Sequence, residues 1–190
     1  MITIFYGDIG KGKTLSAVLL AEFLRDMKIK QKRKYKIFDN CEYKHSTNTF
    51  YDYFSKDNLN DLETDKILIF DEIDKFSDSR NSSAKLNRFL GNLISLSRKT
   101  NTDFIGTLQM WSTVDKRVKN FCSLAIQPKL DKEKQLIHWE IYNSEINRIY
   151  NKSFKIDNLN RLYNIYNTKA LNPDKIEEYK EFLKTISKNF

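Results

Sequence analysis

Along the first two thirds of the chain, short apolar runs alternate with longer segments in which apolar residues recur every three to four positions. Uninterrupted apolar runs are typical of strands buried on both faces, and the longer spacing is typical of helices that cover such a sheet. Strands are predicted at 2–6, 35–40, 66–73 and 103–110, and helices at 13–28, 48–62 and 83–99. This alternation predicts an α/β fold whose mostly parallel sheet carries helices on both faces.

The pattern changes after Phe121. Three further strands are predicted at 123–130, 134–143 and 147–156, and two helices at 158–168 and 173–190, the second with Pro173 at its start. Neither an internal repeat nor a linker rich in Pro, Gly or Ser separates the two parts. We therefore expect one domain, in which residues 1–125 form the core and residues 126–190 add strands and helices packed on it.

The segment GDIGKGKT, residues 7–14, follows the first predicted strand, opens the first predicted helix and fits the pattern G-x-x-x-x-G-K-[ST]. Glycines let the backbone curl so that successive N–H groups point at one anion, and the helix N-terminus presents its unpaired N–H groups to the same anion. Lys13 would bridge the β- and γ-phosphates of a nucleotide, and the Thr14 hydroxyl would bind Mg2+. The residues expected around the phosphates are Gly7, Asp8, Ile9, Gly10, Lys11, Gly12, Lys13, Thr14 and Leu15.

Two acidic residues end the apolar strand ILIFDE, residues 67–72. Parallel α/β sheets bind ligands at the carboxyl ends of their strands, so Asp71 is expected to hold Mg2+, directly or through water. Glu72 is then placed to polarise the attacking water as general base, which favours hydrolysis over nucleotide binding alone. Gln109, at the end of the strand 103–110, is a candidate sensor of the γ-phosphate; an ordinary polar strand end is the alternative.

Three arginines follow these motifs closely in the sequence, namely Arg80, Arg98 and Arg117. Phosphoryl transfer benefits from a cation that a neighbouring subunit supplies. We rank Arg98 first, Arg80 second and Arg117 third as candidates for this cation. Each of them could instead be a surface charge.

The chain is basic, with a net charge of +8 and a pI near 9.3. This balance is compatible with a polyanionic partner, nucleic acid above all, and equally with lysines that only solvate the surface. The cluster KIKQKRKYK, residues 28–36, could contact DNA or RNA phosphates without reading sequence, or form a solvated loop.

The two cysteines, Cys41 and Cys122, lie far apart and show no metal-binding spacing, so neither a zinc site nor a disulfide framework is expected. The sequence has no signal-peptide pattern and no apolar segment long enough to span a bilayer. These features favour a soluble protein in a reducing compartment.

The motif order GDIGKGKT, ILIFDEID, SR, SLSRKTNTDFIGTLQ and VDKRVKN resembles the FtsK/HerA superfamily of P-loop ATPases. More narrowly, the chain is similar to small genome-packaging ATPases of archaeal and membrane-containing viruses, and to zonular-occludens-toxin-like assembly ATPases of filamentous phages. The late stretch RLYNIYNT is similar to a Tyr/Asn/Thr stretch in the C-terminal part of those viral proteins. The resemblance covers residues 1–125 and extends more weakly to 168.

The resemblance implies a RecA-like core of the additional-strand, catalytic-glutamate (ASCE) type. It implies ATP and Mg2+ as ligands, with Lys13, Thr14, Asp71, Glu72 and Gln109 in the roles given above. It also implies a homo-oligomeric ring, often a hexamer, that moves DNA through a central channel and completes each site with an arginine from the next subunit. The phage assembly proteins usually carry a membrane span, and its absence from this sequence favours the packaging type.

The leading hypothesis is therefore an ATP-driven translocase of double-stranded DNA that packages a viral genome, acting in the host cytoplasm or associated with the virion, with capsid or membrane-vertex proteins as further partners. The second hypothesis keeps the ATPase but gives it protein cargo, in the assembly and extrusion of a filamentous particle. The third is a nucleotide-gated binding module without turnover, against which Glu72 argues.

Overall fold

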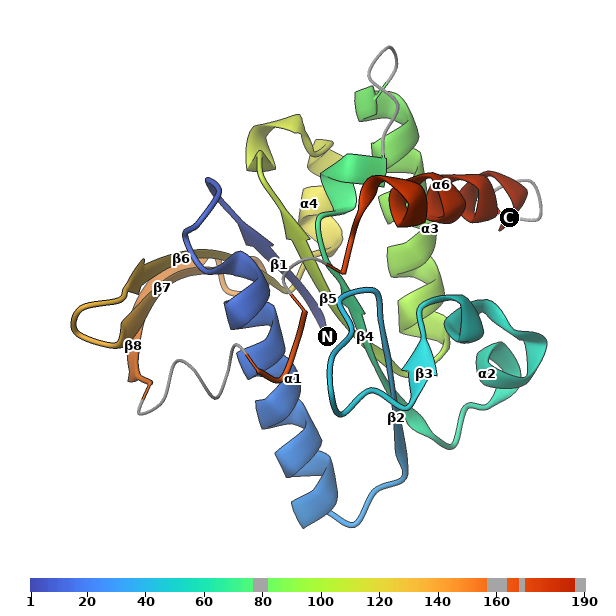
Figure 1. The fold of residues 1–190 in the computed structure, drawn as a ribbon, viewed down its shortest axis with the longest axis horizontal. Coiled ribbons are helices and arrows are strands. Elements are labelled where there is room, and N and C mark those ends of the chain that lie inside the picture. The colour runs from blue at the N-terminus through green and yellow to red at the C-terminus, as the bar shows by residue number, and fades with distance from the viewer. Residues whose placement is uncertain (77–81, 157–163, 168–169, 187–190) are drawn as a thin grey trace.

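The computed structural model describes residues 1–76, 82–156, 164–167 and 170–186. Its centre is an eight-stranded sheet in the order β3-β2-β4-β5-β1-β6-β7-β8 (Figure 1). The strands are β1 Ile2–Tyr6, β2 Tyr35–Asp39, β3 Asn48–Thr49, β4 Asp65–Phe70, β5 Thr102–Leu108, β6 Leu124–Asp131, β7 Leu136–Asn143 and β8 Arg148–Lys155. The helices are α1 Lys13–Lys30, α2 Lys56–Asn60, α3 Ser82–Lys99, α4 Lys116–Phe121 and α6 Pro173–Ile186, with short 3-10 turns η1 Tyr51–Phe54, η2 Ile73–Phe76 and η3 Trp111–Thr113.

The strands from β3 to β6 in this order are parallel, whereas β6, β7 and β8 are antiparallel. Strand β5 lies between β1 and β4, so one strand separates the strand before the glycine loop from the acidic strand. Strand β5 is therefore the additional strand that the family resemblance of the motifs implied. The fold is the expected RecA-like α/β arrangement, and β6–β8 continue the same sheet beyond β1.

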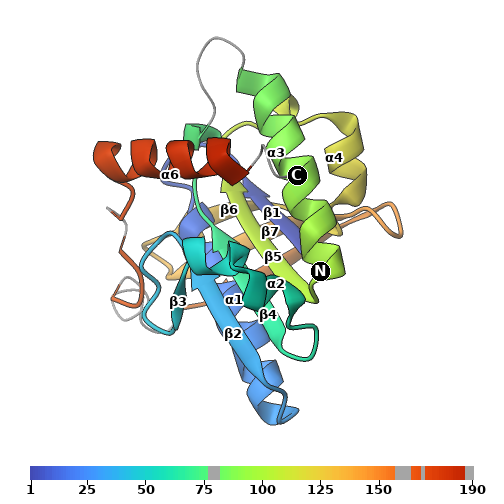
Figure 2. The same cartoon turned by 90° about the vertical axis from the view of Figure 1, so that its right-hand side faces the viewer.

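Helices cover the two faces of the sheet separately (Figure 2). Helix α1 packs on one face over a core that includes Phe5, Ile69 and Ile105. Helices α3 and α6 lie on the other face, over a core that includes Ile4 and Phe104. Strand neighbours such as Ile4 and Phe5 point to opposite faces because side chains alternate along a strand. In the described part of the chain, no helix combines the length and apolar character needed to cross a bilayer.

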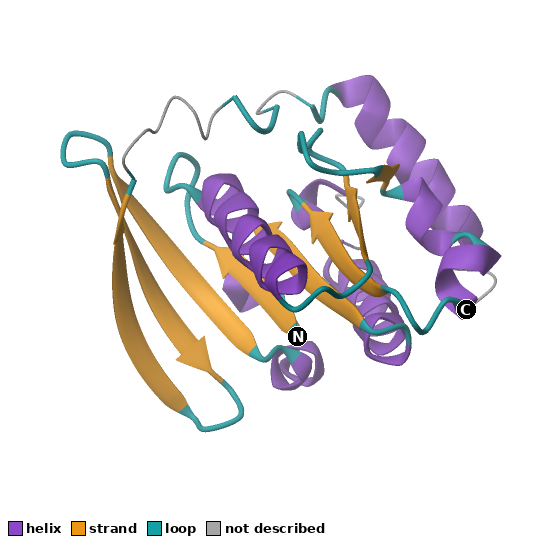
Figure 3. Cartoon of the chain, turned by 90° about the horizontal axis from the view of Figure 1, so that it is seen from below, coloured by secondary structure: helices purple, strands orange, loops and turns teal. Residues whose placement is uncertain are grey.

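The antiparallel strands β6–β8 curve around the side of α1 (Figure 3). The Trp139 indole on β7 donates a hydrogen bond to the Ser16 hydroxyl on α1 at 2.9 Å. Leu130 at the end of β6 lies against Gly12, where an added Cβ would come within 3.3 Å of the Leu130 Cβ. The antiparallel strands therefore support the first turn of α1 and the loop before it.

Two predicted helices differ from the structure. Residues 48–62 break into β3, η1 and α2, because the Ser55 hydroxyl caps α2 by accepting from the Asn58 N–H and a new helix begins there. In the predicted helix 158–168, residues 164–167 form turns, and the others lie outside the described residues. The Ile165 carbonyl instead accepts from the Lys44 N–H at 2.7 Å, and the Asn167 N–H donates to the Cys41 carbonyl at 3.0 Å.

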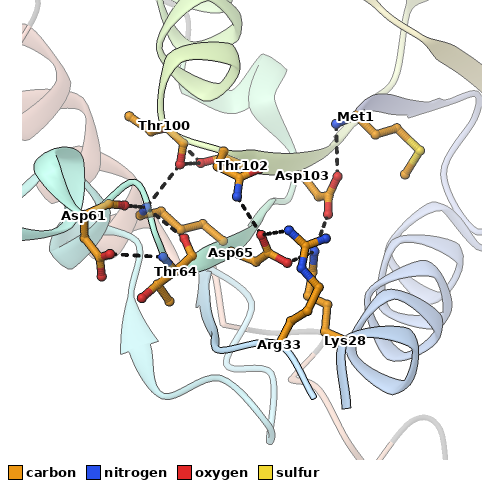
Figure 4. Close-up of polar contacts among 11 residues, drawn as sticks. Met1, Lys28, Arg33, Asp61, Thr64, Asp65, Thr100, Thr102 and Asp103 are labelled. Carbon is orange, nitrogen blue, oxygen red and sulfur yellow. Dashed lines mark hydrogen bonds and ion pairs between the residues drawn. The ribbon is translucent and has the colours of Figure 1, made fainter. Parts of the chain in front are cut away.

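The basic cluster at residues 28–36 is partly committed to internal ion pairs at the amino ends of the strands (Figure 4). The buried Lys28 ammonium lies 3.2 Å from Asp65 and 2.9 Å from Asp103, and Arg33 lies 2.8 Å from Asp65. Lys36 donates to the Asn58 side chain at 2.8 Å. Neither a solvated loop nor a phosphate-contacting patch therefore describes the whole cluster, and only Lys30, Lys32 and Lys34 are left as exposed lysines.

Candidate active site

The loop between β1 and α1 contains glycines in backbone conformations that other residues rarely adopt. Gly10 and Gly12 have φ values of +81° and +89°, in the left-handed region that other residues rarely adopt. Gly12 directly precedes α1 and lies tightly against Leu130. The first turn of α1, beginning at Lys13, therefore directs its unpaired N–H groups into the curled loop, which is the arrangement that binds phosphate.

The Lys13 ammonium folds back onto this loop and donates to the Asp8 carbonyl at 2.9 Å. Burial lowers the pKa of Lys13, while the carboxylates of Asp74, Asp71, Glu72 and Asp8 act in the opposite direction. The lysine is thus the cation at the centre of an acidic site. An entering phosphate would replace the single carbonyl contact with charged ones.

The side chains of Thr14 and Asp71 contact each other at the carboxyl ends of the strands, although 57 positions separate the two residues in the sequence. The Thr14 hydroxyl lies 2.9 Å from Asp71 Oδ1 and 3.1 Å from Oδ2. Burial raises the pKa of Asp71 to about 6, although hydrogen bonds from Thr107 and Thr14 act to lower it. A buried carboxylate that lacks a full countercharge, beside a hydroxyl oxygen, is the setting that a bound cation would stabilise.

This pair of oxygen ligands fits Mg2+, which prefers one or two carboxylate or hydroxyl ligands together with water and nucleotide phosphates. Within the described residues, no group of three or more His, Cys, Asp or Glu side chains forms a protein-only metal site. Thr14 and Asp71 are thus the residues that would hold the ion. The rest of its coordination would come from nucleotide and water.

Two side chains that the sequence analysis did not select fix Asp71 in place. Asn40, directly after β2, accepts from the Asp71 N–H at 2.7 Å and donates to the Asp71 carbonyl at 3.1 Å. The Thr107 hydroxyl on β5 donates to Asp71 Oδ1 at 2.6 Å and accepts from the Glu72 N–H at 2.8 Å. The available signal was polarity, because Thr107 interrupts an apolar strand and Asn40 ends one beside the acidic strand.

Glu72 follows Asp71 with φ at +52°, an uncommon backbone conformation for a residue with a side chain. The neighbouring strand supports this conformation through the Thr107 hydroxyl. The turn continues into η2, where the Lys75 N–H donates to the Glu72 carbonyl at 2.9 Å. The Lys75 ammonium forms an ion pair with the Glu72 carboxylate, and both side chains are partly exposed.

Gln109 lies immediately after β5, which ends at Leu108 and not at the predicted residue 110, and it is half-buried. Its carbonyl accepts from the Gly7 N–H at 3.2 Å and so joins the end of β5 to the glycine loop. Burial raises the pKa of the nearby Asp74, against hydrogen bonds that include the Gln109 backbone N–H. The sensing function of the Gln109 side chain stays a prediction.

The three candidate arginines lie apart from this group or outside what is described. Arg98 ends α3 at the amino ends of the strands, where its guanidinium lies 5.6 Å from the centre of the Phe121 ring. The seven-residue β5 separates that edge from the glycine loop, a distance of roughly 20 Å at ~3.3 Å per residue. Arg80 lies outside the described residues, and Arg117 lies on α4 with its side chain undescribed.

Solved structures share this architecture at low sequence identity. The N-terminal domain of zonular occludens toxin from Neisseria meningitidis is 14% identical, with 87% of this chain and 97% of that chain covered and a TM-score of 0.52. The genome packaging NTPase B204 from Sulfolobus turreted icosahedral virus 2, in complex with AMPPCP, is 14% identical, with 82% and 97% covered and a TM-score of 0.53. EccC from Thermomonospora curvata is 11% identical, with 82% and 37% covered and a TM-score of 0.53.

No curated protein matches the sequence significantly. The family model for the ATPase family associated with various cellular activities (AAA) matches residues 3–127. This range is more than half of the chain and contains the glycine loop, both acidic residues of the site and Gln109. The chain therefore belongs to the AAA family and is a P-loop ATPase.

Proposed function

We propose that this ATPase forms a homo-oligomeric ring that moves double-stranded DNA and packages a viral genome. The observation that carries this proposal is the likeness to the packaging NTPase B204, which covers 97% of that chain and is not confined to a shared nucleotide-binding fragment. A place in the host cytoplasm, docked to capsid or membrane-vertex proteins, belongs to the same proposal.

In the proposed reaction, the N–H groups of the loop and the Lys13 ammonium bind the phosphates of ATP. Thr14 and Asp71 would hold Mg2+, which would supply charge neutralisation for the nucleotide phosphates. Asn40 and Thr107 keep the Asp71 carboxylate at this position. Glu72 orients a water molecule and takes its proton as the water oxygen attacks the γ-phosphorus; the bond from this phosphorus to the β,γ-bridging oxygen breaks, and ADP and phosphate leave. Gln109 is the proposed contact that reports the γ-phosphate to the end of β5.

In a ring, a neighbouring subunit would also supply an arginine to each site. Because Arg98 lies about a strand length from the glycine loop of its own chain, we assign it to the site of a neighbouring subunit. Arg80 and Arg117 are the second and third candidates for this function. The exposed Lys30, Lys32 and Lys34 are candidate contacts to DNA phosphates, since the other basic side chains of their cluster hold internal partners.

A second candidate function keeps the hydrolysis and replaces DNA with protein cargo, as in assembly or extrusion of a filamentous particle. The likeness to the zonular occludens toxin domain, which covers 97% of that domain, favours it. EccC, described as a type VII secretion ATPase, has the same architecture. Nucleotide binding without turnover is the weakest candidate, because Glu72, the proposed general base, directly follows Asp71 in the sequence.

The first experiment is steady-state ATP hydrolysis with and without double-stranded DNA at low and high salt. We expect DNA to stimulate turnover, and the stimulation to fade with salt because phosphate contacts release counterions. Glu72→Gln should retain ATP binding and lose turnover. Turnover that is indifferent to DNA at both salt concentrations would contradict the translocase and favour protein cargo.

A subunit-mixing experiment tests the trans arginine. Arg98→Ala and Lys13→Ala subunits are each expected to be inactive alone. In mixed rings an intact Lys13 site can face an intact Arg98, so part of the activity should return. Failure of mixing to restore activity, with both variants assembled, would remove Arg98 as the trans residue and direct the test to Arg80 and Arg117.

A further inference from the structure

The carboxylate of Glu72, the proposed general base, forms an ion pair with the ammonium of Lys75. Glu72 and Lys75 lie three positions apart across the turn that opens η2, and the Lys75 ammonium contacts Glu72 Oε2. The backbone of this turn is held independently of the ion pair, by the Lys75 N–H donating to the Glu72 carbonyl. The side-chain pair can therefore open while the turn stays closed.

Packing on both sides of Lys75 fixes the backbone around it. Ile73 is fully buried, and the Phe76 ring stacks on Phe70 with centroids 4.9 Å apart. Phe76 also meets Tyr179 of α6 edge to face at 5.7 Å. The Lys75 side chain between them is 38% exposed. Movement at this place is consequently confined to the side chain of the lysine and the carboxylate that it holds.

The contact occupies one of the two oxygens of the carboxylate that is proposed to take the proton. A carboxylate accepts a proton from water through an oxygen lone pair, and an ammonium on Oε2 competes with that water for the same oxygen. The second lysine of the site, Lys13, is turned to the Asp8 carbonyl, so it does not replace Lys75 on Glu72. The pair is partly exposed, and such pairs are weak enough to exchange with solvent or ligand.

We propose that Lys75 is a positioning residue that restrains Glu72 and keeps the basal rate of ATP hydrolysis low. The lysine holds the carboxylate along the η2 turn and away from the attacking water for part of the time. Productive turnover occurs in the fraction of molecules in which the pair is open. This proposal requires the hydrolase chemistry of the chain and is independent of whether the cargo is DNA or protein.

The test is basal ATP turnover without nucleic acid, measured as kcat and KM for Lys75→Met. The variant keeps the length of the side chain and removes its charge. We expect kcat to rise about two- to fivefold, the factor that corresponds to an exposed ion pair, with KM unchanged. Lys75→Arg, which can rebuild the pair, should return kcat toward the wild-type value.

A matched control is Lys180→Met, which removes another lysine paired with an acid three positions away, Glu177 at 2.7 Å on α6. It should leave kcat unchanged. The double variant Glu72→Gln/Lys75→Met should show no gain over Glu72→Gln alone, because the lysine acts only through the carboxylate. A kcat for Lys75→Met equal to or below wild type, including no turnover in either, would overturn the proposal, as would the same gain in the Glu72→Gln background.

These outcomes differ from failure of the translocase proposal. A rise in the basal rate of Lys75→Met together with turnover that ignores DNA would support the restraint and reject DNA as cargo. DNA-stimulated turnover together with an unchanged or lower basal rate of the variant would do the reverse.

Discussion

The Asn40 side chain forms two hydrogen bonds with the backbone of Asp71, accepting from its N–H at 2.7 Å and donating to its carbonyl at 3.1 Å. The two residues directly follow the neighbouring strands β2 and β4. The amide of Asn40 therefore continues the pairing between these strands beyond their last paired residues, Asp39 and Ile69. Asn40 thus supports the carboxylate proposed to bind Mg2+, acting through the Asp71 backbone and not through the carboxylate itself.

Asn40→Ala is expected to lower kcat by about 10- to 100-fold, the range typical of lost support behind a metal ligand. It should also cost about 1–3 kcal/mol of stability, because two buried backbone groups of Asp71 lose their partners. The measurements are steady-state hydrolysis and denaturant unfolding of the same preparations.

The matched control is Asn58→Ala. Asn58 is similarly buried and also bonds through both side-chain atoms, to Lys36 and the Asp52 carbonyl, but it lies far from the glycine loop. It should lose stability while kcat is retained. Equal loss of kcat in both variants would mean that Asn40 supports the fold and not the Asp71 carboxylate.

Thr107→Val tests the second support. Valine keeps the shape of threonine, but the Asp71 carboxylate loses a donor and the Glu72 N–H loses its acceptor. We expect a loss of about 1–3 kcal/mol in stability and a lower kcat, with Thr107→Ser close to wild type. Hydrolysis and thermal unfolding measure both effects.

Thr3→Val on the adjacent strand β1 is the matched control for this substitution. Thr3 is fully buried, and in the described structure its hydroxyl has no hydrogen-bond partner. Removal of that hydroxyl should stabilise the protein by about 1 kcal/mol and leave kcat unchanged. If both valine variants destabilise equally, the Thr107 hydroxyl network is not the source of the effect.

Asp71→Asn separates stability from activity. The folded-state pKa of Asp71 is raised to about 6, above its ordinary value of 3.8, so the ionised carboxylate destabilises the nucleotide-free protein above pH 6. This penalty is absent below pH 4 and grows as pH rises through the interval between the two pKa values. The amide variant should therefore exceed wild type in stability by about 2–3 kcal/mol at pH 8 and by little at pH 4, while turnover is lost.

The measurement is the Tm of the nucleotide-free proteins from pH 4 to 8. A difference in Tm that does not change with pH would show that Asp71 is not the titrating group. Addition of ATP and Mg2+ should stabilise wild type more than Asp71→Asn, because the ion compensates the carboxylate that the variant lacks.

The features that the sequence predicted are motifs made of consecutive residues. The loop 7–14 and the pair Asp71–Glu72 each stand at a strand end, and alternation of strands and helices was enough to bring them to one edge of the sheet. Asn40 and Thr107 could not be selected this way. Their importance depends on strand order, which places β2 and β5 on either side of β4, and no local pattern states that order.

The sequence alone also does not show which charged side chains form internal ion pairs. Lys28 and Lys34 look alike in the sequence, yet Lys28 is buried between Asp65 and Asp103 and Lys34 is exposed. Their partners come from β4 and β5, far along the chain. The interruption of the predicted helix at 48–62 has a local cause instead. Ser55 lies inside an otherwise helical pattern, and its side chain caps the N-terminus of a new helix, α2.

Lys28→Met is expected to be strongly destabilising for this reason, by about 3–5 kcal/mol, because it leaves the buried Asp65 carboxylate and the partly buried Asp103 carboxylate without their shared cation. Burial is the largest single influence on Asp103 and opposes its ionisation, but the Lys28 ammonium and the N-terminal ammonium of Met1 together outweigh it and lower the pKa of this carboxyl. The stabilisation is therefore present above the ordinary pKa of Asp103 and is lost as pH falls through the lowered value. Urea unfolding at pH 7 and at pH 3 measures the difference, which should be larger at pH 7.

Lys30→Met and Lys34→Met are the matched controls, since both lysines are exposed on the same segment. Neither should change stability by more than about 0.5 kcal/mol. If this segment contacts DNA, each should weaken DNA binding and reduce its dependence on salt concentration by about one ion. The contrary result is a Lys28→Met protein as stable as the two controls: the network of Figure 4 would then be a set of surface charges, and Lys28 would return to the candidates for binding DNA.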